Sequence, residues 1–217
     1  MSPSHTPSPA PDATVIRTGR RGAVVGLPCS VLLIAMGAVG VFGAVVIATG
    51  NQKGESTVTG FAGLVFMLAL GVAGVFLFIA NWANRNTRIL VDHTGLWVDS
   101  GRLRNVIPRQ SLAGVGLHWS KFGRGQKLYS LELFPTVPID RDDPVLWTLV
   151  RDEEPLHPDL PRLRYRVPFP TGFQQQVVTA VQQYVPHIWL GESERAEGHI
   201  GRPDIKGHKE RTRGRMH

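Results

Sequence analysis

The sequence has a single cysteine, Cys29, and two long stretches with no charged residue at all. One cysteine excludes an internal disulfide framework, which agrees with a reducing compartment. No charge occurs from Gly22 to Gln52, nor again from Ser56 to Asn84, although the chain carries 24 basic and 17 acidic residues. Because a globular protein distributes its charges more evenly along the chain, this pattern predicts an integral membrane protein with two spans near its N-terminus.

Both uncharged stretches exceed the roughly 20 apolar residues that a helix needs to cross a bilayer. We predict a transmembrane hairpin over residues 22–84, with spans at about 23–49 and 58–82. Two core helices of a soluble protein and, for the first stretch, a cleaved signal peptide are the alternatives. The length of the stretches favours retained spans, because the apolar region of a signal peptide is typically about 7–15 residues long.

Basic residues flank the hairpin on one side. Arg17, Arg20 and Arg21 precede the first span, and Arg85 and Arg88 follow the second, whereas the connection from residue 50 to 57 has only one lysine. The positive-inside rule therefore predicts that both termini are cytoplasmic, that the protein lies in the plasma membrane, and that residues 50–57 face outward.

Small residues recur at helical spacing in both spans, and such residues let two helix backbones approach closely in lipid. They serve either the packing of the hairpin on itself or a homodimer of two hairpins. The candidates for helix packing are Gly37, Gly40, Ala44 and Ala48 in the first span and Ala69 and Ala73 in the second.

After the spans, short alternating runs separated by turn residues predict about seven β-strands in a sandwich or barrel. Apolar residues spaced by three and four positions in Thr171–Val185 then predict one amphipathic helix, which ends before Pro186. The expected strands are 88–92, 96–99, 102–107, 112–119, 127–134, 145–150 and 163–169.

The resemblance of this sequence to a known family lies in residues 91–98 (VDHTGLWV), 101–104 (GRLR), 107–108 (IP) and 111–115 (SLAGV). These segments resemble bacterial pleckstrin-homology-like (PH-like) domains of the actinobacterial type, which follow a two-helix membrane hairpin. Many relatives have a tryptophan where this chain has Arg109. The resemblance implies a PH-like barrel over 87–190 that acts as a binding or assembly module at the membrane. It implies no particular ligand.

Basic residues of this domain are candidates for contact with lipid or a partner. Arg162, Arg164 and Arg166 alternate along one expected strand, so they share one face. Anionic headgroups attract such a face, but an ordinary solvated strand face is the alternative, because acidic residues balance the domain. The remaining candidates are Arg102, Arg104, Lys121, Arg124 and Lys127.

No sequence pattern indicates catalysis, a cofactor or a metal. The eight histidines lack the spacing of a zinc site, and no phosphate-binding loop occurs. Residues 1–21 and 191–217 have the composition of disordered tails, and without interleaved aromatic residues the basic C-terminal tail predicts no specific nucleic-acid binding. We therefore expect a membrane-anchored module that binds an unidentified protein partner in an envelope-associated assembly. A sensor of anionic lipid is the alternative, and an enzyme is a distant third.

Overall fold

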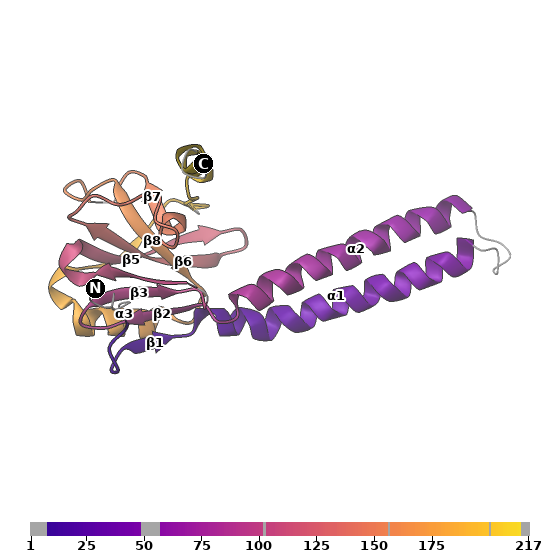
Figure 1. Ribbon diagram of the computed structural model, residues 1–217, viewed down its shortest axis with the longest axis horizontal. Coiled ribbons are helices and arrows are strands. Elements are labelled where there is room, and N and C mark those ends of the chain that lie inside the picture. Colours follow the sequence, from indigo (N-terminus) through magenta and orange to yellow (C-terminus); the bar gives the residue numbers. More distant parts are fainter. Residues whose placement is uncertain (1–7, 49–56, 102, 156, 200, 214–217) are drawn as a thin grey trace, which may run out of the picture. The chain divides into compact units, whose positions relative to one another are not determined.

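The computed structural model describes residues 8–48, 57–101, 103–155, 157–199 and 201–213. These residues form two compact units, a helical hairpin from Gly19 to Thr87 and a domain built from the residues before and after it (Figure 1). The hairpin consists of α1 (Thr18–Ala48) and α2 (Thr57–Asn84).

The domain contains strands, two further α-helices and short 3-10 turns. The strands are β1 (Thr14–Ile16), β2 (Arg88–Val91), β3 (Gly95–Asp99), β4 (Arg104–Pro108), β5 (Leu112–Phe122), β6 (Gln126–Pro135), β7 (Val150–Asp152), β8 (Leu163–Phe169) and β9 (Trp189–Glu194). The helices are α3 (Gln174–Tyr184) and α4 (Ile205–Arg213), and the 3-10 turns are η1 (Arg109–Ser111), η2 (Trp147–Leu149) and η3 (Pro186–Ile188).

The strands form two separate sheets. The first has the order β1-β2-β3-β4 and is antiparallel throughout, while the second has the order β7-β8-β6-β5-β9. In the second sheet β9 runs parallel to β5, and the remaining pairs of neighbouring strands are antiparallel. The prediction of a mainly-β domain with a C-terminal helix is confirmed, but the predicted closed barrel is wrong, because no strand hydrogen bonds join the two sheets in the described part of the chain.

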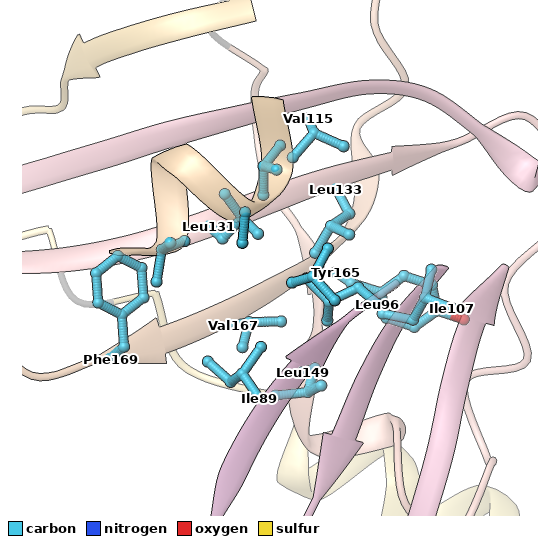
Figure 2. Packing of buried hydrophobic residues seen from close by; sticks show 14 of the residues in the cluster. Ile89, Leu96, Ile107, Val115, Leu131, Leu133, Leu149, Tyr165, Val167 and Phe169 are labelled. Atoms are coloured by element: carbon cyan, nitrogen blue, oxygen red, sulfur yellow. The ribbon is translucent and has the colours of Figure 1, made fainter. Parts of the chain in front are cut away.

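One hydrophobic core lies between the two sheets. Figure 2 shows side chains from β2, β3 and β4 meeting those of β5, β6 and β8 in a single cluster. The alternation along each strand selects these residues, since every second side chain of a strand points to the same face. Leu117, Leu131 and Leu133, for example, are at most 1% exposed.

Helix α3 packs on this core through its apolar stripe, as its sequence predicts. Val177 and Val181 are buried, and Phe173 and Tyr184 at the two ends of the stripe pack against the core while partly exposed. The helix begins at Gln174, three residues later than expected.

The described parts of both tails, residues 8–21, 191–199 and 201–213, contain secondary structure, whereas their composition predicted disorder. Near the N-terminus, β1 pairs with β2, and α1 begins at Thr18. Near the C-terminus, β9 pairs with β5, and α4 packs on the domain, where the ring of His208 stacks on Trp147 with 3.9 Å between ring centroids. These segments were missed because β1 is only three residues long and both tails are held by distant parts of the chain.

Within the hairpin, α1 faces α2 through small residues that recur every seven positions. Ala23, Ser30, Gly37 and Ala44 are all buried. A Cβ atom added to Gly37 would lie 2.6 Å from the Cα atom of Gly71. The backbones therefore approach closely at this point, in the way that small residues permit between membrane helices.

The packing candidates divide into two groups. Gly37, Gly40 and Ala44 lie on the interface within the hairpin, whereas Ala69 and Ala73 are exposed, because Met67, Gly71 and Gly74 form the α2 side of that interface. Ala69 and Ala73 therefore do not serve the packing of the hairpin on itself, and their use in a homodimer of two hairpins stays a prediction. The side chain of Ala48 lies outside the described residues.

Both helices are long and apolar enough to cross a membrane, over Thr18–Ile47 and Phe61–Asn84. Their outward surfaces carry large apolar side chains, and among the most exposed are Val39 at 72%, Phe42 at 73% and Phe76 at 69%.

The glycine contact yields a first prediction. The substitution Gly37→Ala would push a methyl group into the backbone of α2, and overpacking of this kind costs about 1–3 kcal/mol. We expect the helical unit of the full chain in dodecyl maltoside micelles to melt at a lower temperature by circular dichroism. Gly43→Ala is the matched control, because a Cβ atom there meets nothing within 4 Å. Equal losses for the two variants would contradict this packing.

Candidate functional site: a buried charge network and an exposed basic hairpin

The face of the five-stranded sheet that points away from the core carries charged side chains that solvent barely reaches. On β6, Leu131 and Leu133 enter the core, so Glu132 between them lies on the opposite face. We call the buried and partly buried titratable residues of this face and of the segments that cover it the charge network: His118, Glu132, Arg151, Glu153, Arg164, Arg166 and Arg195.

Glu132 is the centre of the charge network, and its side chain is fully buried. The Nε atom of Arg164 lies 2.6 Å from Oε2 of Glu132. Arg195 holds the same carboxylate with two hydrogen bonds, from Nε to Oε1 at 2.8 Å and from Nη2 to Oε2. Arg166 is the strand partner of Glu132 on β8, and its Nε atom lies 3.8 Å from Oε1. A carboxylate is tolerated at such depth only when it is paired and hydrogen-bonded in this way.

Glu153 extends the charge network toward β7. Its carboxylate accepts a hydrogen bond from Nη2 of Arg164 at 3.0 Å, and its backbone carbonyl accepts one from Nη1 of the same arginine at 2.7 Å. The ring of His199 lies 3.1 Å from the same carboxylate. Arg164 therefore joins two carboxylates, which explains how it can be fully buried.

The chain after β9 covers the charge network. We call residues 195–199 and 201 the C-terminal strap. Its backbone continues alongside β5, where the N–H groups of Arg195 and Gly198 donate to the carbonyls of Trp119 and Lys121 at 2.8 and 2.7 Å. Further along, the Oγ atom of Ser120 donates to the carbonyl of His199 at 2.7 Å.

Gly201, at the end of the strap, contacts two arginines, Arg151 and Arg166. Its carbonyl accepts a hydrogen bond from Nε of Arg151 at 2.8 Å. Its φ angle is 62°, and a Cβ atom at this position would collide with the guanidinium of Arg166. Glycine is therefore required here for both its backbone conformation and the close approach.

The charge network shifts the titration of its members. Burial would raise the pKa of Glu132, but the hydrogen bonds from Arg195 and the positive charge of Arg164 hold that pKa below its usual range. For His118, burial lowers the pKa to about 4, and the nearby arginines add to this effect against the attraction of Glu132. His118 is consequently neutral at pH 7, and its ring nitrogens have no hydrogen-bond partner among the described residues.

A second feature of the domain is the tip of the β5–β6 hairpin, which we define as residues 121–128. Every residue of the tip is exposed. Lys121, Arg124 and Lys127 lie among the exposed apolar side chains of Phe122 and Leu128, which are 44% and 36% exposed. Basic and apolar residues are thus mixed on one protruding turn.

The structure separates the three arginines that were expected to form one basic face. Arg162 is exposed and pairs with Glu154 at 2.7 Å. It lies one residue before β8, whereas Arg164 and Arg166 share one face of that strand, as predicted, and both are buried in the charge network. The expectation that all three meet solvent is corrected for these two, because the C-terminal strap covers that part of the sheet.

The other basic candidates lie at two places. Arg104 pairs with Asp99 at 2.8 Å at one end of the four-stranded sheet. Lys121, Arg124 and Lys127 lie on the hairpin tip. Arg102 lies outside the described residues.

Several residues of the charge network and of the C-terminal strap escaped the sequence analysis. Glu132 and His118 could have been noticed, because each is a polar residue alternating with apolar ones in an expected strand. Arg195 and His199 carried no such signal, since they lie in a segment whose composition predicts disorder.

Among the described residues, no group of three or more His, Cys, Asp or Glu side chains has the arrangement of a metal site. The chain matches no protein-family description, no curated protein and no solved structure. The expected protein partner, the association of two copies through the hairpin and the exclusion of specific nucleic-acid binding stay predictions.

The low pKa of His118 makes stability depend on pH. The imidazole titrates near 6.5 in the unfolded chain but near 4 in the folded domain, so the unfolded chain binds more protons between these values. Stability is therefore lost as the pH falls from 6.5 toward 4, by up to about 3 kcal/mol. We expect the melting temperature of the domain to drop from pH 7 to pH 5, and the drop to shrink in His118→Gln. The exposed His93→Gln should retain the full drop. An unchanged drop in His118→Gln would contradict the assignment.

Proposed function

We propose that this chain is a membrane-anchored, PH-like binding module that acts at the cytoplasmic face of the plasma membrane. In this proposal the α1–α2 hairpin spans the bilayer, and the domain binds a protein partner there as part of an envelope-associated assembly. The proposal concerns binding and assigns no reaction to the chain.

The apolar exterior of the hairpin carries the proposal. Side chains such as Phe42, Phe66 and Phe76 are between 63% and 73% exposed, and they point away from the small residues of the interface. A soluble protein rarely exposes a continuous apolar surface of this extent. In a bilayer the same surface is favourable, because each Leu, Ile, Phe or Val at the centre of a span contributes about −0.3 to −0.6 kcal/mol to insertion.

The end of α2 has the chemistry of a membrane–water interface. Trp82 stacks on Phe78, with 5.9 Å between ring centroids. The guanidinium carbon of Arg85 lies 3.8 Å from the centre of the Trp82 ring, and Nη1 of Arg85 donates to the Trp82 carbonyl at 2.6 Å. Tryptophan and arginine are typical of this position, where one end of a side chain is apolar and the other is wet.

Connectivity and charge support the cytoplasmic placement of the domain. Three residues, 85–87, join α2 to β2, and Arg17 alone separates β1 from α1. Both connections carry arginine, which the positive-inside rule places in the cytoplasm. Short connections of this kind keep the domain next to the membrane whatever partner it binds.

The PH-like part of the proposal has support in the arrangement of the domain. Two sheets, antiparallel except for the pairing of β9 with β5, share one core, and an amphipathic helix, α3, follows β8 and packs against that core. The added β1, β9 and α4 make this domain larger than the expected 87–190.

Contact with anionic lipid is a second candidate function, and the hairpin tip favours it. Lys121, Arg124 and Lys127 can attract anionic headgroups at about 1 kcal/mol for each charge near the surface, while Phe122 can enter the interface. The basic strand face that first suggested lipid binding contributes little, because Arg164 and Arg166 are buried.

Accessibility of single cysteines in whole cells tests the proposed topology. On a Cys29→Ser background, an impermeant maleimide should label Gly54→Cys, which lies in the expected outer connection. It should not label Val137→Cys, whose position in the domain is 53% exposed, until the cells are permeabilised. Labelling of Val137→Cys in intact cells would place the domain outside and contradict the proposed orientation.

A further inference from the structure

An open pocket of about 860 Å³ lies where β6 extends beyond the end of its neighbour β8. The register between these strands ends at the pair Tyr129–Phe169, so the part of β6 before Tyr129 has no strand on this side. The segment that leaves β8, Pro170 and Thr171, also lines the pocket. The pocket is thus a product of the unequal strand lengths.

The pocket has apolar walls and a polar end. Its apolar lining includes Leu128 and Pro168, which alternate with the core-facing residues Tyr129 and Phe169 and therefore lie on the same face as Ser130 and Arg166. Its polar end is formed by three side chains, which belong to Ser130, Arg166 and His199. Ligand pockets commonly combine an apolar lining with a few polar groups that fix orientation.

Arg166 has unused hydrogen-bonding capacity at this end. Its side chain is 4% exposed, and its one hydrogen bond within the described residues runs from Nε to Oγ of Ser130 at 3.0 Å. Nη1 is buried on the side of Gly201 and Glu153 without a hydrogen-bond partner among those residues, and the carboxylate oxygen of Glu153 lies 3.9 Å away. A guanidinium offers five N–H donors, so a buried one with a single hydrogen bond is expected to have a further acceptor.

The charge network beside this end of the pocket carries more positive than negative charge. The charge network contains four arginines, Arg151, Arg164, Arg166 and Arg195, against two carboxylates, Glu132 and Glu153. Because His118 is neutral at pH 7, the difference is two positive charges. Buried charges without partners are costly, and an anion at the pocket would reduce that cost.

We propose that the pocket binds an organic phosphate, with the phosphate group at Arg166, Ser130 and His199 and the apolar part of the ligand against Leu128 and Pro168. Arginine suits this role, because its planar fork donates two parallel hydrogen bonds to phosphate oxygens. A phosphate monoester carries a charge close to −2 at pH 7, which matches the excess of the charge network. This site goes beyond the proposed membrane function and does not depend on it.

The phosphate could belong to a soluble compound or to a lipid headgroup, and calorimetric titration of the full chain in dodecyl maltoside micelles distinguishes the two. The probes are inorganic phosphate, phenyl phosphate, dihexanoylphosphatidic acid and, as an uncharged-headgroup control, dihexanoylphosphatidylcholine. We expect phenyl phosphate to bind about tenfold more tightly than inorganic phosphate, because its ring enters an apolar pocket. Tighter binding of the short-chain phosphatidic acid would identify a lipid headgroup as the source, and tighter binding of phenyl phosphate a soluble compound.

Substitutions then locate the site. Arg166→Lys keeps the charge but loses the fork, so the affinity for phenyl phosphate should fall at least about tenfold. The matched control is Arg162→Gln, one residue before β8, which is 64% exposed and should leave the affinity unchanged within twofold.

Leu128→Gln keeps the test decisive if Arg166→Lys fails to fold, since residue 128 is 36% exposed and lies outside the charge network. It should weaken phenyl phosphate about threefold or more and leave inorganic phosphate unchanged, whereas Val137→Gln should change neither. The proposal is overturned if the unmodified chain shows no saturable binding of either organic phosphate up to millimolar concentration. It is equally overturned if Arg162→Gln weakens binding as much as Arg166→Lys, or if Leu128→Gln has no effect.

Discussion

The carboxylate of Glu132 is the group on which the outer half of the domain depends. It lies at the middle of the central strand of the five-stranded sheet, on the face opposite the core, and it is fully buried. A buried carboxylate requires cationic partners, and one strand, β8, and the C-terminal strap supply them through Arg164, Arg166 and Arg195. Apolar packing thus covers one face of the sheet, and ion pairs cover the other. Arg195, one of the ion-pair partners, lies in a segment whose composition predicts a disordered tail.

The two faces of the five-stranded sheet are therefore held by different interactions, which respond differently to substitution. The core between the sheets rests on the alternation of apolar residues, which tolerates moderate changes of shape. The charge network rests on a balance of charges and on the close approach of Gly201, so loss of one partner leaves other charges buried and unpaired. The same network leaves an excess of positive charge beside an open pocket, which is why binding of an anion follows from the fold and not from any sequence motif.

Local patterns predicted much of the secondary structure. The expected strand 163–169 coincides with β8, and the apolar stripe of α3 identifies its buried side. Three things could not be read from such patterns. Alternation shows that Arg164 and Arg166 share a face but not that a distant segment covers that face. The short strands β1 and β9 exist through pairing with remote partners, and whether two sheets close into a barrel depends on long-range hydrogen bonds. In the hairpin, the four-residue spacing of alanines drew attention to Ala69 and Ala73, while the contact follows a seven-residue repeat through Ala23, Ser30, Gly37 and Ala44.

A double-mutant cycle on Glu132 and Arg195 tests most directly whether the C-terminal strap completes the domain through this carboxylate. The free energy of unfolding would be measured for the full chain in micelles and for Glu132→Gln, Arg195→Gln and the double variant. Each single change should cost about 3–5 kcal/mol, because it leaves a buried charge without its partner. The double variant should cost less than the sum by at least about 1.5 kcal/mol, since interacting residues are not additive. Additive losses, or a cost for Arg195→Gln no larger than the roughly 0–1 kcal/mol of a surface ion pair, would contradict the account.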